Sequence, residues 1–163
     1  MSRPNAGERR KLLEIVDRYN RVHDLLKSEA RESAAWAIRS GLWSLPPGMD
    51  VDILTDLISN ALHDDELKGE KGRKGRARVC VTATITDAET GESRQQTLWA
   101  HVVDLVNNDD RDFVIRSLKQ RAEAIRADQD ALERDTEIYS AMFVARGKRP
   151  LQLRFFWDRG DGE

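Results

Sequence analysis

The side chains that could carry out acid–base or nucleophilic chemistry are few and scattered along this sequence. The three histidines are His23, His63 and His101, and Cys80 is the single cysteine. His63 precedes an acidic run, 64–66, and imidazole with carboxylates suits zinc or manganese, but no second histidine cluster supports such a site. Cys80 and His101 fall on neighbouring predicted strands, yet the pattern places no acidic side chain to orient them as a nucleophilic pair.

Motifs that would anchor an enzyme are absent from the sequence. No serine lies in a Gly-x-Ser-x-Gly context, and no phosphate-binding glycine motif follows a strand and opens a helix. A single cysteine excludes a multi-cysteine zinc site. We therefore expect no catalytic residue, no metal and no cofactor. The remaining enzymatic interpretation is an unrecognised nuclease or hydrolase that uses one of the histidines.

A basic run with regularly spaced glycines is the best candidate for contact with a functional partner. Gly69, Gly72 and Gly75 are spaced by three within a segment, 64–76, that we expect to be a mobile loop. The cations of this segment, with Arg78 just after it, can reach phosphates of a nucleic-acid backbone, and the alternative is a solvated linker kept soluble by its charge. Because no aromatic residues are interleaved, such binding would not read bases. The cations are Lys68, Lys71, Arg73, Lys74, Arg76 and Arg78.

Composition limits the class of protein. A length of 163 residues suits one domain, and 39% hydrophobic with 34% charged residues describes a chain with much solvated helix surface. The net charge of -2 provides no global field for nucleic acid or membrane. The single Cys80 excludes an intramolecular disulfide, and no apolar run approaches the roughly 20 residues of a membrane span. We therefore expect a reduced, cytoplasmic protein without membrane contact.

Hydrophobic periodicity predicts three helices, at about 6–40, 50–63 and 108–146. The polar run 27–33 interrupts the apolar stripe of the first, so this helix is either solvated or broken near its middle. The first opens with a capping box from Asn5 to Glu8, and Asp50 caps the second. The third carries apolar residues at alternating steps of three and four, which is the seam of a helix that pairs with another helix. The first and third helices are long enough to form a coiled-coil-like arm, within one chain or between two chains.

Alternation of apolar and polar residues predicts strands at about 77–86, 93–103 and 151–157. The loop 87–92 joins the first two as a hairpin, with Gly91 at the position that requires positive φ. In that register Thr86 opposes Ser93 and Val81 opposes Leu98.

The predicted fold class is therefore α+β, a single domain over 1–163. Its small antiparallel or mixed three-stranded sheet combines the hairpin with the C-terminal strand, is packed by helices, and carries the helical arm. Aromatic side chains on both sheet faces indicate either helix cover or an interface.

These features favour a non-enzymatic interaction, assembly or regulatory protein that works through the arm and an aromatic face as a homodimer, with another protein as a further partner. The alternative is a nucleic-acid-binding regulator that uses residues 68–78. The predicted interface residues are Leu118, Ile125, Gln129, Leu132, Trp99 and Phe156.

Overall fold

The computed structural model describes residues 5–44, 50–69, 72–124 and 129–155. It contains helices and two small antiparallel sheets of two strands each, so the predicted α+β class is confirmed while the three-stranded sheet is not. Contacts divide the chain into two compact units, with unit 1 formed by 1–65 and 82–100 and unit 2 by 66–81 and 101–163.

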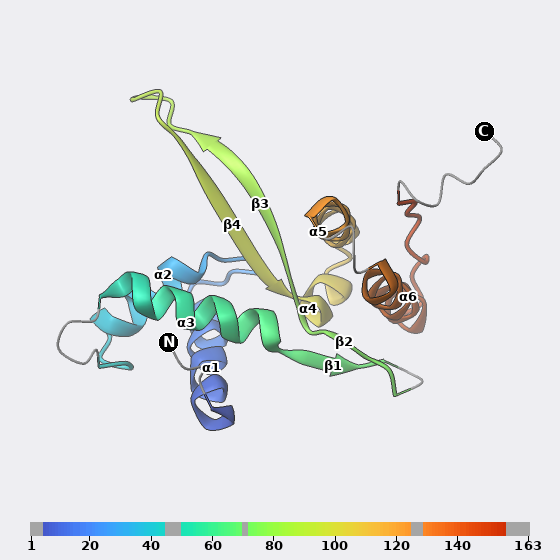
Figure 1. The fold of residues 1–163 in the computed structure, drawn as a ribbon, viewed down its shortest axis with the longest axis horizontal. Helices are drawn as coiled ribbons and strands as arrows, with labels where there is room; N and C mark the ends of the chain where they lie inside the picture. The colour runs from blue at the N-terminus through green and yellow to red at the C-terminus, as the bar shows by residue number, and fades with distance from the viewer. Residues whose placement is uncertain (1–4, 45–49, 70–71, 125–128, 156–163) are drawn as a thin grey trace. The chain divides into compact units, whose positions relative to one another are not determined.

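Three helices form the body of unit 1: α1 (Ala6–Val22), α2 (Ala30–Arg39) and α3 (Val51–Asp64) (Figure 1). The predicted capping box is confirmed, since the Glu8 N–H donates to Asn5 Oδ1 at 2.9 Å and the Asn5 N–H donates to Glu8 Oε2 at 3.3 Å. Asp50 caps α3 as predicted. The fully buried side chains include Leu12, Ala34, Ala37, Leu54 and Ile58.

The helix predicted over 6–40 is broken rather than continuous, because a turn and an extended segment separate α1 from α2 where the polar run 27–33 begins. Asp24 has φ 53°, a left-handed conformation that aspartate tolerates and that stops a helix. Ser28 then forms an isolated antiparallel bridge with Trp99, with both backbone hydrogen bonds, at 3.0 and 2.8 Å. No glycine or proline lies between residues 8 and 40, so the polar run 27–33 was the signal of this break in the sequence.

Strands β3 (Arg78–Thr86) and β4 (Ser93–His101) form the predicted hairpin. The Asp87 N–H donates to the Glu92 carbonyl at 2.8 Å, and Gly91 has φ 72° as the turn requires. The hydroxyls of Thr86 and Ser93 lie 3.0 Å apart, in agreement with the predicted register. β4 ends two residues earlier than predicted because the His101 ring caps the next helix, accepting the Val103 N–H at 3.2 Å.

Unit 2 contains a second hairpin where the sequence suggested a loop. Strands β1 (Glu66–Lys68) and β2 (Lys74–Arg76) pair antiparallel, with Leu67 opposite Gly75. The glycines have a packing role: a Cβ on Gly69 would lie 2.9 Å from Ile138 Cγ1, and one on Gly75 would lie 2.8 Å from Asp135 Oδ1. The backbone of this hairpin therefore approaches a helix so closely that only glycine fits.

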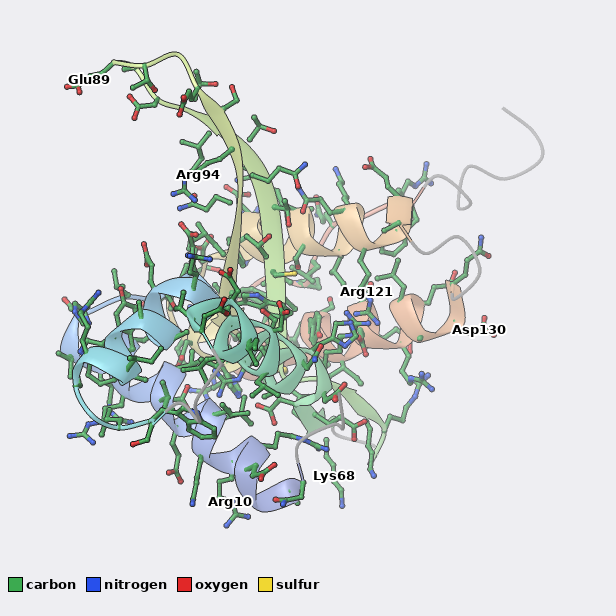
Figure 2. All side chains as sticks on the ribbon, turned by 60° about the vertical axis from the view of Figure 1, so that its left-hand side comes forward. Arg10, Lys68, Glu89, Arg94, Arg121 and Asp130 are labelled. Atoms are coloured by element: carbon green, nitrogen blue, oxygen red, sulfur yellow. The ribbon has the colours of Figure 1, made fainter. Side chains whose placement is uncertain are left out.

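The remaining elements of unit 2 are helices α4 (Val102–Asn107), α5 (Arg111–Ala124) and α6 (Gln129–Ala145). The continuous helix predicted over 108–146 is wrong, because α5 and α6 lie side by side (Figure 2). The Arg111 guanidinium lies 5.0 Å from the centroid of the Phe143 ring. In one straight helix these two residues would be about 48 Å apart.

Pairing of α5 with α6 also explains the apolar seam. The seam residues Leu118, Leu132, Tyr139 and Phe143 are each no more than 1% exposed, so the chain buries them itself. The coiled-coil-like arm that the seam suggested is therefore replaced by a short helical hairpin. The predicted C-terminal strand, 151–157, is also not found in its described part, since residues 151–155 carry no strand. Among the described residues, no helix has the length and apolar character to cross a membrane.

Replacing Gly75 with alanine is predicted to destabilise the protein by about 1–3 kcal/mol, because the new methyl group must displace Asp135 and Ile138. Urea-induced unfolding followed by circular dichroism measures the change. Gly7→Ala is the matched control, since its Cβ would meet only Asn5 Oδ1 at 3.4 Å and alanine favours the helix. Equal stability of the Gly75 variant and the unmodified protein would contradict the close approach.

Candidate interaction surface

The outer half of the β3–β4 hairpin is exposed on both faces. We call residues 82–97 the ribbon. Ala83, Thr84 and Thr86 on β3 are exposed, as are Ser93 and Gln95 on β4. Figure 2 shows Glu89 at the tip of the ribbon, away from the three helices of unit 1. A two-stranded ribbon in water is marginally stable by itself, so its order must come from its own cross-strand contacts and its attachment.

Cross-strand hydroxyl pairs hold the ribbon together. The hydroxyls of Thr82 and Thr97 lie 2.9 Å apart, and those of Thr86 and Ser93 lie 3.0 Å apart. At the tip, Asp87 Oδ1 accepts the N–H groups of Glu89 and Thr90 at 2.8 and 3.3 Å. One face of the ribbon consequently carries only uncharged polar side chains, those of Thr82, Thr84, Thr86, Ser93, Gln95 and Thr97.

The backbone of β3 leaves an edge open. Because the Asp87 N–H bonds to the Glu92 carbonyl, alternation along the ladder directs the N–H and C=O groups of Thr84 and Thr86 away from β4. Within the described residues, no backbone partner outside the hairpin is found for either threonine. Such a row of outward groups is a template for another strand.

The outer edge of β4 is occupied at its base. The Ser28 bridge takes the outward N–H and C=O groups of Trp99. The next residue, Glu29, has a side chain only 11% exposed, and its carboxylate accepts from Gln96 Nε2 at 2.5 Å and from Arg94 Nη2 at 3.3 Å. These contacts attach β4 to the start of α2. The edge of β4 is thus paired at its base, whereas the edge of β3 is open at Thr84 and Thr86.

The charge of Glu29 depends on these partners. Burial alone would raise the pKa of Glu29, but hydrogen bonds from Gln96 and then Arg94, with the Arg94 charge, outweigh burial and lower the pKa below its usual value. The folded state therefore favours the carboxylate form.

The six predicted phosphate-contacting cations lie in different environments. Lys68 and Lys74 are exposed and directly opposite one another in the β1–β2 hairpin. Arg73 is exposed and donates to Glu137 Oε2 at 2.7 Å. Arg76 is half-buried, with its pKa lowered by burial and then by nearby Arg121, and Arg78 is only 4% exposed. Lys71 lies outside the described residues. The structure therefore keeps only part of this group available for an anionic partner.

The predicted interface residues are mostly buried. Leu118 and Leu132 are each 1% exposed and Trp99 is 8% exposed, whereas Gln129 is half-buried at the first position of α6. Ile125 and Phe156 lie outside the described residues. The buried members stabilise their own units and offer little surface to a partner.

The histidines and the cysteine that could take part in chemistry have neighbours that do not activate them. The His23 ring lies at the end of α1, where Nδ1 is 2.9 Å from the Tyr19 carbonyl and the ring centroid is 4.3 Å from that of Tyr19. Burial raises the pKa of the Cys80 thiol above its ordinary value, despite the opposing effect of Arg76 and Arg121, which disfavours the nucleophilic thiolate. His63 lies 3.8 Å from Asp64, and no group of three or more metal-binding side chains occurs in the described ranges.

A charged cluster in unit 2 was not foreseen from the sequence. Arg121 Nη1 and Asp135 Oδ2 lie 2.5 Å apart, with side chains 13% and 4% exposed. Close by, the Tyr139 hydroxyl donates to the Arg76 carbonyl at 2.8 Å, and burial, followed by Asp135, raises the pKa of Tyr139. A buried pair of this kind fixes how α5 faces α6. Arg121 and Asp135 are fourteen residues apart in the sequence, so a prediction that placed both in one helix could not bring them into contact.

Comparison with known proteins does not add to these observations: no family model, curated protein or solved structure matches the chain. The open β3 edge was also missed in the sequence, although a signal was present. From Val79 to Thr86 the strand contains no charged residue, glycine or proline. Such residues ordinarily protect an exposed edge.

Replacing Glu29 with glutamine is predicted to reduce stability by about 1–3 kcal/mol at neutral pH, because charge-assisted hydrogen bonds are lost. The folded pKa is lowered, so the contribution is present above the ordinary value of 4.5 and is lost as pH falls through the folded pKa. The stability difference between the two proteins should therefore shrink below that pH. Urea unfolding at stepped pH values measures it.

The control for this pH series is Glu123→Gln, which removes the same charge from an exposed position on α5. We expect it to change stability by less than about 0.5 kcal/mol. A difference between Glu29→Gln and the unmodified protein that stayed constant down to strongly acidic pH would exclude the assigned role of the carboxylate.

Proposed function

We propose that this protein is a non-enzymatic assembly protein that forms a homodimer through the open edge of β3. The observation that supports the proposal is an ordered ribbon whose β3 edge is exposed, uncharged and without a backbone partner at Thr84 and Thr86 among the described residues. The homodimer expected from the sequence is kept, and the ribbon replaces the helical arm as the surface responsible.

The composition of β3 supports strand addition. Exposed edges in natural proteins usually carry a lysine, a proline or a bulge that prevents pairing with another chain. β3 has none of these between Val79 and Thr86, whereas β4 carries the charged Arg94 near its exposed end. The difference between the two strands favours β3 as the pairing edge.

The sequence of β3 also suits a two-fold axis. If two copies pair antiparallel about Thr84, the outward groups of Thr82 meet those of Thr86 of the partner subunit, and Ala83 faces Ile85 of the partner subunit. Both subunits then contribute the same residues and make the same contacts reciprocally, as an isologous interface requires. No like charges oppose each other in this register.

Formation of a four-stranded sheet would stabilise the ribbon. Strand addition supplies backbone hydrogen bonds at Thr84 and Thr86, for which the described residues offer no backbone partner. A sheet of three or more strands is stable where a lone hairpin is marginal. The uncharged hydroxyl and amide side chains on one face of the ribbon would become continuous across the two subunits.

Light scattering coupled to size exclusion should give twice the monomer mass of 18.6 kDa for the unmodified protein. Thr84→Pro is predicted to give the monomer mass, because proline removes the outward N–H while leaving the bonds to β4 intact. Thr84→Lys should act similarly by placing two like charges at the axis.

Gln95→Pro is the matched control for this experiment. Gln95 lies opposite Thr84 in the hairpin, and alternation directs its N–H away from β3 as well. This variant perturbs the ribbon equally but from the other edge, so it should remain a dimer. A monomer for the unmodified protein at micromolar concentration would refute the proposal. If only Gln95→Pro lost the dimer, the interface would be formed by β4 and the proposed role of β3 would be wrong.

A further inference from the structure

A cleft in unit 1 carries an unassigned set of cations beside a tryptophan. Its volume is about 470 Å³, within the range of pockets that bind small ligands. We infer that this cleft binds single-stranded nucleic acid, with arginines on phosphates and a base stacked on Trp43. This inference is independent of the proposed dimer. The cleft is lined by Lys11, Glu14, Ile15, Arg18, Arg21, Leu42 and Trp43.

The end of α2 determines where the tryptophan lies. Gly41 has φ 71°, a left-handed conformation that terminates the helix and reverses the chain. The N–H groups of Leu42 and Trp43 both donate to the Ala37 carbonyl, at 2.9 and 3.3 Å. Trp43 is held half-buried by this turn, so part of its ring remains available in the cleft.

The cations come from one face of α1. Lys11, Glu14, Arg18 and Arg21 follow one another at steps of three and four, which places them in a row along a helix. All four are exposed, and no ion pair joins them to another described residue. Three positive charges and one negative charge leave a net positive row available to an anion.

The length of the row favours a strand over a single nucleotide. Lys11 and Arg21 are ten residues apart on α1, which corresponds to about 15 Å along the helix axis. Several phosphates are needed to contact cations spread over this distance. An aromatic ring with an accessible face beside a cationic groove is the usual arrangement for single strands, because unpaired bases can stack on the ring.

A duplex fits the cleft less well. Bases in a double helix are stacked on each other, so Trp43 would contribute nothing to its binding. The row would then attract only phosphates, and affinity would not depend on the aromatic ring. Dependence on Trp43 therefore distinguishes a strand from general attraction of polyanions.

Fluorescence anisotropy with a labelled oligothymidylate of about twelve nucleotides tests the inference at about 50 mM salt. Arg18→Glu is expected to weaken binding about tenfold or more and to lower the slope of log affinity against log salt by about 0.7. Trp43→Leu, which keeps an apolar side chain on the turn, is expected to weaken binding about fivefold or more.

Arg10→Glu is the matched control, because Arg10 is exposed on the same helix, outside the cleft, and carries the same charge (Figure 2). The general effect of the changed net charge is expected to be small, so this variant should change affinity less than about twofold. Equal losses in the Arg10 and Arg18 variants, or a Trp43 variant that binds normally, would overturn the site.

Two further outcomes decide the ligand. Displacement of the oligonucleotide by ATP at similar molar concentration would overturn the strand in favour of a mononucleotide. A duplex of the same length that binds as tightly as the strand would overturn the stacking mode. Circular dichroism melting of each variant checks that a loss of binding is not caused by unfolding. Failure of the folded, unmodified protein to bind the oligonucleotide would also overturn the inference.

Discussion

Two backbone hydrogen bonds between Ser28 and Trp99 organise unit 1. They require an extended backbone at Ser28, so a continuous helix from α1 into α2 is impossible. They also place Glu29 where its carboxylate meets Arg94 and Gln96. A single bridge therefore separates two helices, attaches the ribbon, and leaves β3 as the strand with the open edge.

Local signals in the sequence predicted local structure well. The capping box at Asn5 and Glu8, the cap at Asp50 and the hairpin turn at Gly91 each depend on residues within a few positions of one another. The errors are long-range. Nothing near Ser28 indicates that a strand seventy residues away will pair with it, and the helical repeat of the seam is the same whether its apolar face meets another chain or folds back on itself.

The site was predictable only in part, for the same reason. The basic run was visible, but contacts from α6 determine which cations already have an acidic partner: Glu137 binds the exposed Arg73, while Arg76 lies near Asp135 and Tyr139. The glycines at 69 and 75 suggested freedom of the backbone, whereas the structure uses them for close approach to Ile138. Glycine spacing alone does not distinguish a flexible loop from a tightly packed hairpin.

The unequal edges of the ribbon have a consequence for the size of any assembly. A sheet with two open edges can add strands without limit, which leads to fibres. In this protein the base of β4 is already paired with Ser28, and Arg94 lies further along the same strand. Pairing through β3 about a two-fold axis would use the β3 edge of both copies at once, so this edge would add no third subunit.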